Sequence, residues 1–579
     1  MSTRPVVIGN CSGFYGDRLQ AAREMVEGVG AGGKGVDVLC GDYLAELTML
    51  ILAKAQAKDP ALGYARTFLT QLEDVLGLCL ERGIKIVSNA GGLNAAGLAA
   101  AIEALGTGAK VAYVEGDDLR GSLDAITPAV DGKPVSANAY LGGWGIAEAL
   151  AAGADVVVTG RVTDASLVVG PAAWWHGWAR DDWDALAGAV AAGHVIECGP
   201  QATGGNYPFL DEITDRRYPG FPIAEVASDG SSVITKHPGT GGLVSVGTVT
   251  AQLLYEIAEP AYLGPDVTSH FDALTLTQEA EHRVAITGTT GSPPPETLKV
   301  ALNDVGGFRN TMTLVLTGLD IEAKAAHAES LLFEVLGGRE RFAEVDVRLL
   351  RFDHPDAASN AEATAHLRVT VKDADQRKVG RAFSNATMEL ALGGYAGFHT
   401  LTPPTDASAF GIYRPAAVPR TAVTQTVVLP DGERRVIADP ECAPAAPVRG
   451  YQGQGPDIRA RAAEPQVRVP LGLVAGARSG DKGGNANVGL WTRDDDSYAW
   501  LRGYLTVEKV RELIGAEAAD LQIERFDLPN LRAVNVVVHG VLGAGVASST
   551  RPDPQAKGLG EYLRSRLVDV PAALVPATR

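Results

Sequence analysis

The stretch Ile84-Lys-Ile-Val-Ser-Asn-Ala-Gly-Gly-Leu-Asn94 carries the pattern on which the fold prediction depends. Residues 84–87 form a short apolar run that is typical of a buried strand, and the loop from Asn89 to Asn94 consists of small and polar residues. An alanine-rich segment with helical periodicity follows this loop. Such a strand–loop–helix unit is the repeating element of sheets with parallel strands.

The same unit recurs on both sides of this stretch. Strands are expected at residues 5–9, 36–40, 84–87, 110–114 and 155–158. We therefore predict an α/β domain at 1–295 with a mostly parallel, Rossmann-like sheet. In such a sheet the strand-to-helix loops emerge at one edge, where ligands bind. The polar residues in these loops are expected to be neighbours: Asn10, Asp17, Asp42, Asn89, Asp117 and Asp164.

The rest of the chain follows other patterns. Residues 296–428 alternate in the order strand, strand, helix, strand, strand, helix, which predicts a ferredoxin-like α+β region. Residues 429–466 contain repeated prolines without a hydrophobic period and are predicted to be a linker. Residues 467–579 read as a small C-terminal α+β domain.

Composition excludes several classes of protein. The net charge of −18 opposes binding to nucleic acid or to anionic membranes. No apolar run of 18 residues suggests a membrane span, and the N-terminal residues lack the features of a signal peptide. The five cysteines are few and scattered, which favours a reducing compartment. We expect a cytoplasmic protein that binds a small molecule and forms a homo-oligomer.

Three residues are candidates for acid–base chemistry. Asp42 follows the expected strand at 36–40 and could serve as a general base, with capping of the next helix as the alternative. Asp164 stands in a similar loop, and capping competes with catalysis there too. His237 lies beside Lys236 in a glycine-rich loop and could be a catalytic acid or base, although a lone histidine is more often structural.

Other loops offer binding groups. Gly91 and Gly92 let the backbone of the loop between Asn89 and Asn94 approach an anion, whereas a tight turn with an Asn cap is the plain alternative. Arg161 could clamp a carboxylate or phosphate, or simply hold its loop through an ion pair with Asp164. The remaining candidates for substrate binding are Asn10, Gly204, Gly205, Asn206, Lys236 and Lys482.

Lys482 belongs to the stretch Ala477-Arg-Ser-Gly-Asp-Lys-Gly-Gly-Asn-Ala-Asn487, which reads as a loop able to form anion-binding backbone nests. An internal ion pair that stabilises a long turn is the alternative. We predict that this loop closes over the site of the first domain, in the same chain or in a neighbouring subunit. The ten histidines show no H-x-x-x-H spacing, so no metal site is expected.

Several of these loops together resemble one family. The segments Ile8-Gly-Asn-Cys-Ser-Gly-Phe-Tyr-Gly-Asp17, Gly41-Asp-Tyr-Leu-Ala-Glu46, Gly160-Arg-Val-Thr-Asp164 and Lys236-His-Pro-Gly-Thr-Gly-Gly242 resemble the acyclic terpene utilisation protein A (AtuA-like) family. The stretch from Ala477 to Asn487 resembles the AtuA-like C-terminal domain, which in the family is either fused or encoded separately. The resemblance implies breakdown of branched, terpenoid acids as coenzyme A thioesters, beside biotin-dependent carboxylases.

Three hypotheses of function remain open at this point. The first is an enzyme that acts on an acyl-CoA thioester or related branched carboxylate by lyase, hydratase or hydrolase chemistry, with coenzyme A as part of the substrate and no tightly bound cofactor. The second is a nicotinamide-dependent oxidoreductase, which the missing G-x-G-x-x-G motif opposes. The third is a non-catalytic subunit of an acyl-CoA carboxylase assembly, which the many polar loops oppose.

Overall fold

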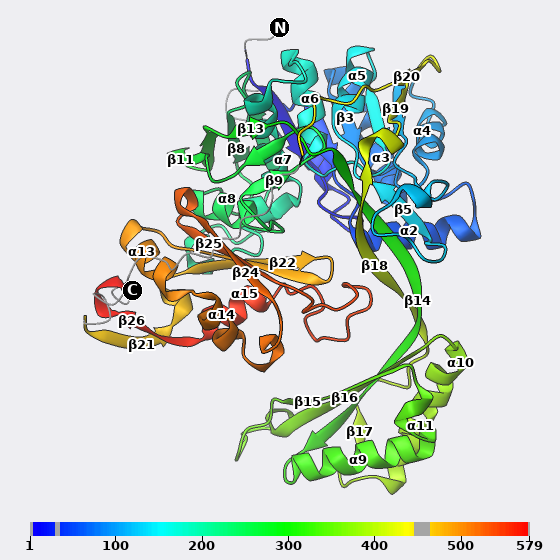
Figure 1. The fold of residues 1–579 in the computed structure, drawn as a ribbon, viewed down its shortest axis with the longest axis vertical. Coiled ribbons are helices and arrows are strands. Elements are labelled where there is room, and N and C mark those ends of the chain that lie inside the picture. Colours follow the sequence, from blue (N-terminus) through cyan, green and yellow to red (C-terminus); the bar gives the residue numbers. More distant parts are fainter. Residues whose placement is uncertain (1–3, 29–34, 445–463, 577–579) are drawn as a thin grey trace. The chain divides into compact units, whose positions relative to one another are not determined.

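The computed structural model describes residues 4–28, 35–444 and 464–576, which form two compact units (Figure 1). The first unit comprises the chain up to Asn303, Tyr413–Val546 and the chain from Asp553 onward. The second comprises Asp304–Ile412 and Ala547–Pro552. The candidate site lies wholly within the first unit.

The main sheet of the first unit has a parallel centre. Its order within the described residues is β11-β12-β8-β7-β1-β2-β3-β6-β4-β19-β20. The five central strands are parallel, and they pair as the repeated strand–loop–helix pattern predicts. These strands are β1 (Val6–Asn10), β2 (Val38–Gly41), β3 (Lys85–Ser88), β4 (Val111–Glu115) and β6 (Val156–Thr159).

The prediction of a mostly parallel sheet is wrong at both flanks. On one side lie β7 (Pro222–Val226), β8 (Ser232–Lys236), β11 (Thr275–Ala280) and β12 (Arg283–Thr287), and on the other β19 (Thr426–Val428) and β20 (Arg434–Val436). All of them pair antiparallel with their neighbours, so the sheet is mixed. The connection of residues 227–231 is too short for the crossover that a parallel pair needs.

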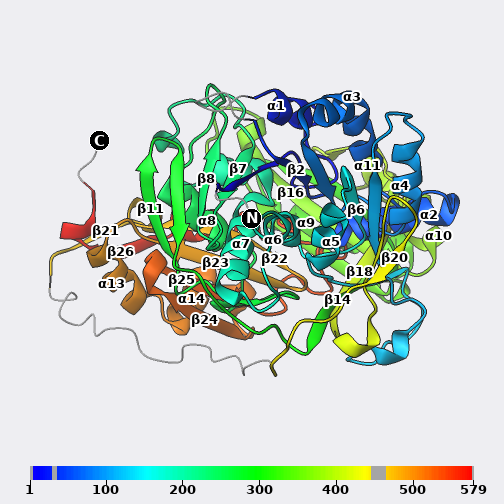
Figure 2. The ribbon, with the colours of Figure 1, turned by 90° about the horizontal axis from the view of Figure 1, so that it is seen from above.

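Helices cover both faces of the parallel centre (Figure 2). On one face α1 (Ala21–Glu27), α3 (Arg66–Arg82) and α4 (Ala95–Glu103) pack on residues such as Ile86 and Val158. On the other face α5 (Trp144–Ala151), α6 (Ser166–His176) and α7 (Trp183–Ile196) pack on Val87 and Val157. Successive strand residues point to opposite faces, so alternate residues enter different cores.

Further elements of the first unit lie around this layer. Helix α2 (Glu46–Lys58) follows the loop after β2, and α8 (Val246–Leu253) is closed at its N-terminus by a capping box of Ser245 and Thr248. A small sheet has the order β13-β10-β9. Its strands are β9 (Ala261–Leu263), β10 (Thr268–His270) and β13 (Thr290–Ser292). None of the described helices is both long and apolar enough to cross a membrane.

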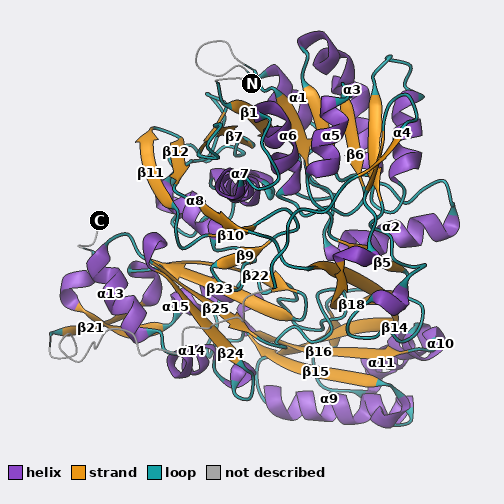
Figure 3. Cartoon of the chain, turned by 45° about the horizontal axis from the view of Figure 1, so that its top comes forward, coloured by secondary structure: helices purple, strands orange, loops and turns teal. Residues whose placement is uncertain are grey.

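The second unit is an antiparallel sheet with helices packed on it (Figure 3). The strand order is β15-β16-β14-β17, with α9 (Ile321–Leu336) and α11 (Arg381–Gly393) contributing to one core. This β-α-β-β-α-β order differs from the predicted order of strand, strand, helix, strand, strand, helix, because the first two predicted strands are one and β17 follows the second helix. The strands are β14 (Thr297–Thr317), β15 (Glu344–Arg351), β16 (Thr364–Asp373) and β17 (His399–Thr400), and α10 (Gln376–Val379) precedes α11.

Strand β14 differs from the prediction, because one strand replaces the two expected at 298–305 and 311–316. Gly306 and Gly307 do not interrupt it. A Cβ at Gly306 would lie 2.3 Å from the Phe410 ring, and one at Gly307 would lie 2.9 Å from the Asp373 carbonyl oxygen. The two glycines therefore serve close packing. At its start β14 pairs with β5 (Ser136–Ala139), and β18 (Ser408–Pro419) also pairs with it.

The C-terminal part has a four-stranded sheet of order β22-β23-β25-β24 and a separate pair of β21 with β26. Its strands are β21 (Gln466–Pro470), β22 (Gly476–Lys482), β23 (Asn485–Trp491), β24 (Ile523–Leu528), β25 (Ala533–Val538) and β26 (Leu567–Pro571). Its helices are α13 (Asp495–Tyr504), α14 (Val507–Ile514) and α15 (Leu559–Ser565). Residues 445–463 of the predicted linker lie outside the described residues, whereas Arg434–Val436 is strand β20.

The predicted glycine-rich loop around Lys482 is instead a β-hairpin. Lys482 pairs with Asn485, which leaves Gly483 and Gly484 as the two-residue turn. Gly480 lies inside β22, and a Cβ there would lie 2.4 Å from the Tyr255 ring. The glycine that suggested a loop thus allows the two parts of the first unit to pack closely.

Candidate active site

Asp42 and Asn89 meet where β2 and β3 end. The Asn89 amide donates to Asp42 Oδ1 over 2.6 Å, and its own Oδ1 accepts a bond of 2.8 Å from the backbone N–H of Tyr43. Asp42 Oδ1 also accepts the N–H of Leu44. Helix α2 begins at Glu46, four residues after Asp42, with Ala45 as N-cap and no side-chain cap, so Asp42 does not cap it. Both side chains are buried.

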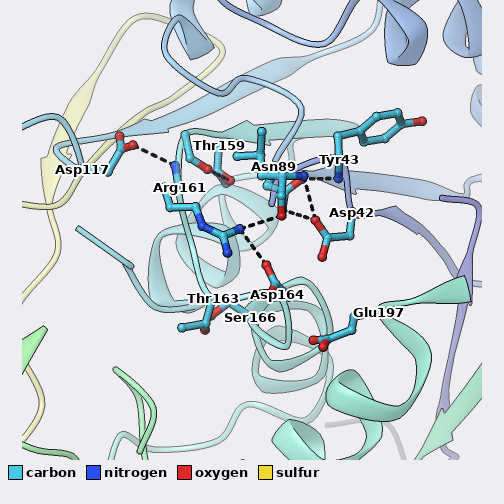
Figure 4. A network of polar contacts seen from close by, with 12 residues as sticks. Asp42, Tyr43, Asn89, Asp117, Thr159, Arg161, Thr163, Asp164, Ser166 and Glu197 are labelled. Carbon is cyan, nitrogen blue, oxygen red and sulfur yellow. Dashed lines mark hydrogen bonds and ion pairs between the residues drawn. The ribbon is translucent and has the colours of Figure 1, made fainter. Parts of the chain in front are cut away.

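Arg161 and Asp164 come from the loop after β6 and lie beside Asp42 (Figure 4). Arg161 Nη1 donates to Asp164 Oδ1 over 2.7 Å and to the Leu44 carbonyl oxygen over 3.1 Å. Its guanidinium stacks on the ring of Tyr140, with 4.1 Å between the guanidinium carbon and the ring centroid. The ion pair therefore fixes the loop, as one sequence interpretation expected. A guanidinium has five N–H donors, however, and these two bonds use one nitrogen.

Asn10 fixes the end of α7. Its amide donates to the carbonyl oxygens of Ile196 and Glu197, over 2.7 Å and 3.1 Å. Its Oδ1 accepts the N–H of Ser12. These bonds use both amide protons of Asn10, which therefore positions the C-terminal end of α7 beside the site.

Glu197 adds a buried carboxyl group to that of Asp42, which is also buried, and that of Asp164, whose side chain is 26% exposed (Figure 4). Burial and the charge of Asp164 raise the pKa of both Glu197 and Asp42, while the charge of Arg161 lowers both. The two groups thus bind protons more tightly than ordinary carboxyls, and each influences the titration of the other site. We refer to Asp42, Asp164, Glu197 and Arg161 as the acid cluster.

Asp117 binds the backbone of Arg161, which is a member of the acid cluster. Its Oδ2 accepts the backbone N–H of Arg161 and the amide of Asn138, both over 2.8 Å. Burial raises the pKa of Asp117 to about 6, and the bonds from Arg161 and Asn138 oppose this shift. Asp117 therefore holds the Arg161 backbone and titrates within the range where many enzymes work.

Lys482 brings a positive charge from the C-terminal part to this region. Its ammonium donates to the carbonyl oxygen of Glu256 over 2.9 Å. The charge of Lys482 lowers the pKa of both Glu197 and His194. Asn487 also links the C-terminal part to the segment after α8. Its amide donates to the Leu254 carbonyl oxygen, and its Oδ1 accepts the N–H of Glu256.

Comparison with family models identifies the family. A model described as acyclic terpene utilisation family protein AtuA matches residues 6–429, and one described as the AtuA ferredoxin-like domain matches residues 469–569. The chain belongs to the acyclic terpene utilisation family. The resemblance of its loops to this family is thereby confirmed, for both the N-terminal and the C-terminal part. No curated protein matches the chain.

In this AtuA-family chain the glycines of the loop after β3 do not form an anion cradle. The N–H groups of Ala90, Gly92, Leu93 and Asn94 all donate to protein oxygens. Asn94 caps α4 by accepting the N–H of Gly97, which is the alternative that the sequence offered. A Cβ at Gly91 would lie 2.5 Å from the Thr159 carbonyl oxygen, so this glycine allows β3 and β6 to end side by side.

Lys236 and His237 are held by contacts that include no member of the acid cluster. The Lys236 ammonium donates to the Thr240 carbonyl over 2.8 Å, and His237 Nε2 lies 2.9 Å from the Met25 carbonyl oxygen. Burial lowers the pKa of His237, and no acidic side chain contributes. The loop with Gly204, Gly205 and Asn206 folds on itself, since the Gly205 N–H donates to the Pro200 carbonyl.

The sequence interpretation missed Glu197 and His194 because both lie on or beside a helix and not in a strand-end loop. One signal could have found them. Residues 185–196 of α7 are buried throughout, and His194 and Glu197 are polar residues placed at the end of this apolar helix. A charged residue that ends a fully buried helix needs a partner or a shifted pKa.

A small pocket lies elsewhere in the first unit and is lined in part by Trp144, Asp266 and Arg420. No residue of the acid cluster lines it. Arg420 donates to the carbonyl oxygens of Pro295 and Pro265, and Asp266 accepts the N–H of Gly143. These groups have structural partners, so we place the active site at the acid cluster. In the described part of the chain no set of three or more His, Cys, Asp or Glu side chains could hold a metal ion.

Proposed function

We propose that the chain is an enzyme that acts on an acyl-CoA thioester or a related branched carboxylate, by lyase, hydratase or hydrolase chemistry. The supporting observation is the acid cluster, in which Asp42 and Glu197 both have raised pKa values beside Arg161. Pairs of carboxyl groups whose environments shift their titration supply the acid and the base of many enzymes. Membership of the acyclic terpene utilisation family supports the class of substrate.

Three members of the acid cluster and Lys482 have roles in this proposal. Asp42 accepts a proton from the substrate, since its Oδ1 is held by Asn89 and the Leu44 N–H. Arg161 and Lys482 contact the carboxylate, thioester oxygen or phosphate groups of the substrate. Asp164 orients Arg161 through their ion pair. Coenzyme A enters as part of the substrate and not as a resident cofactor.

Hydrolysis through a cysteine is the version with least support. Cys198 follows Glu197 directly, but burial and the charge of Glu197 raise the pKa of its thiol. A thiol with a raised pKa is a poor nucleophile at neutral pH. Addition or elimination assisted by two carboxyl groups therefore suits the site better.

Thermal-shift measurements test the proposal. Free coenzyme A, straight and branched acyl-CoAs, NAD(H) and NADP(H) are compared on the wild-type chain and on Arg161→Lys. An acyl-CoA at about a hundred times its Kd should stabilise the wild type by roughly 2.7 kcal/mol. It should stabilise Arg161→Lys by less, because lysine lacks the planar guanidinium that bonds to an anion through two N–H groups. Arg283→Lys is the matched control, since Arg283 forms a bidentate pair with Glu225 outside the cluster.

The other functions would give different results. Stabilisation by NAD(H) alone would indicate the oxidoreductase, and co-purification with a carboxylase without any ligand response would indicate the assembly subunit. The expected homo-oligomer and cytoplasmic location stay part of this proposal. Light scattering during size-exclusion chromatography measures the oligomeric state.

A further inference from the structure

Three buried polar atoms without a hydrogen-bond partner gather at the end of α7. They are both ring nitrogens of His194 and Glu197 Oε2. His194 is 1% exposed and Glu197 is 6% exposed. A buried polar group without a partner costs about 1–3 kcal/mol, so such groups are rare and each calls for a reason.

His194 and Glu197 face each other across one turn of the helix. His194 Nδ1 lies 3.4 Å from Glu197 Oε1. The His194 ring packs on Tyr262 and Phe271, with centroid distances of 5.1 Å and 5.5 Å, and these two rings stack on each other. An imidazole that packs against two aromatic rings and is shielded from water is disfavoured as a cation.

The charges around this pair come from five other segments. Asp164 and Arg161 lie in the loop after β6, Asp42 in the loop after β2, Glu256 after α8, and Lys482 on β22. Lys557, before α15, is a third cation, and its ammonium lies 3.7 Å from the Glu256 carboxylate. The carboxyl groups of Asp42, Asp164, Glu197 and Glu256 outnumber the three cations. Like charges at such a site cannot all ionise without a large penalty, so at least one carboxyl group keeps its proton.

Glu197 is the carboxyl group that best fits this description. Asp164 is paired with Arg161, and Asp42 accepts two N–H bonds, which favour its ionised form. Glu197 Oε2 accepts none. A protonated carboxyl needs fewer donors than a carboxylate and can itself donate to the neutral His194.

We propose that Glu197 is a second catalytic residue, the proton donor of the site, and that His194 is a neutral positioning residue that accepts its proton in a hydrogen bond at rest. This inference rests on the proposed function for the chemistry that follows. In a dehydration, the Asp42 carboxylate takes a proton from a substrate carbon, and the Glu197 carboxylic acid gives its proton to the leaving hydroxyl.

The proton balance of this step closes. The substrate loses one molecule of water, Asp42 gains a proton and Glu197 loses one. Return of a proton from Asp42 to Glu197 restores the resting state, and hydration is the same sequence reversed. The coupling between the two carboxyl groups is what this exchange needs.

Infrared difference spectroscopy on the full chain at pH 7 tests the resting state without a substrate. The wild-type spectrum minus that of Glu197→Gln should show the carbonyl stretch of a protonated carboxylic acid, which shifts in D₂O. Glu225→Gln is the matched control, since Glu225 is paired with Arg283, and it should show carboxylate bands only. Carboxylate bands for Glu197 at pH 7 would overturn the proposal.

If Glu197→Gln does not fold, a second measurement tests the proposal through the protonation state of His194. In a ¹⁵N-histidine-labelled chain, His194 is identified by its loss in His194→Gln. Its ring should stay neutral from pH 8 to about 5, because burial lowers the pKa of His194 to about 4. A protonated His194 at pH 7 would contradict the assignment.

Turnover separates this inference from the proposed function. With an acyl-CoA substrate, Glu197→Gln should lose roughly 10²–10⁴-fold in kcat, and Glu197→Asp should recover part of it. His194→Gln should shift the pH profile more than it lowers the maximum. If the protonated acid is observed and no acyl-CoA binds, the proposed function fails alone. If acyl-CoA binds and Glu197 is ionised, this inference fails alone.

Discussion

Asp42 shows what a single buried carboxyl contributes at the residue scale. In Asp42→Asn the amide oxygen can still accept the N–H groups of Leu44 and Asn89, so the melting temperature should stay close to that of the wild type. The amide cannot take a proton, and a positioned base contributes about 10²–10⁴-fold in rate. We expect at least a hundredfold loss of turnover with the identified substrate. Near-normal turnover would assign Asp42 a structural role.

Asp117 predicts a pH dependence of stability. Its folded pKa of about 6 lies above the ordinary value of 3.8, so the folded state holds this proton more tightly than the unfolded chain. The resulting stabilisation is complete below about pH 4 and is lost as the pH rises through about 6. At 1.36 kcal/mol per pKa unit the full change is about 3 kcal/mol.

Urea unfolding at pH 4 and pH 7 measures this effect against Asp117→Asn, which does not titrate. The free energy of unfolding of the wild type relative to the variant should fall by about 3 kcal/mol over this interval. A relative gain of the wild type with rising pH would show that the Asp117 pKa is lowered and not raised.

At the scale of elements, strand β22 depends on a glycine that lets the main domain approach. In Gly480→Val the added Cβ would lie 2.4 Å from the Tyr255 ring, which is also contacted by Arg478 and Lys557. Overpacking of this kind costs about 1–3 kcal/mol. We expect a lower melting temperature and reduced activity, because β22 ends at Lys482.

Gly77→Ala is the control for this strand variant. Gly77 lies inside α3, and a Cβ there meets no atom within 4 Å. Alanine should stabilise the helix by about 0.5–1 kcal/mol. Equal destabilisation by both variants would argue against a packing role specific to Gly480.

At the scale of the whole molecule, the C-terminal part sets the charge of a site built by the main domain. The charge of Lys482 lowers the pKa of His194, so Lys482→Met should raise it above the value of about 4. Nitrogen NMR of labelled histidine during a pH titration measures the change. Lys509→Met is the control, because Lys509 bonds to Glu512 on the surface of α14. An unchanged His194 titration in Lys482→Met would separate the two parts electrostatically.

The sequence alone determined the features that depend on local patterns. Alternating strands and helices predicted the parallel centre of the main sheet, and helical periodicity predicted α9 and α11. The same pattern predicted that four residues lie at one edge of the main sheet, because parallel strands end together: Asn10, Asp42, Asn89 and Asp164. The helix cap at Asn94 was one of its two alternatives. These strands, helices and the helix cap follow from local hydrogen bonding and from the spacing of apolar side chains within short segments.

Only the tertiary structure decided which distant groups complete the site. Asn10 holds Glu197 at the end of α7, 187 residues away in sequence, where its charge acts on Asp42. The separate placement of His237 likewise depends on long-range packing, since its ring contacts the Met25 carbonyl oxygen. The raised pKa values of Asp42 and Glu197 arise from burial and from neighbouring charges. Burial is a property of the packed chain, so no local pattern of residues contains it.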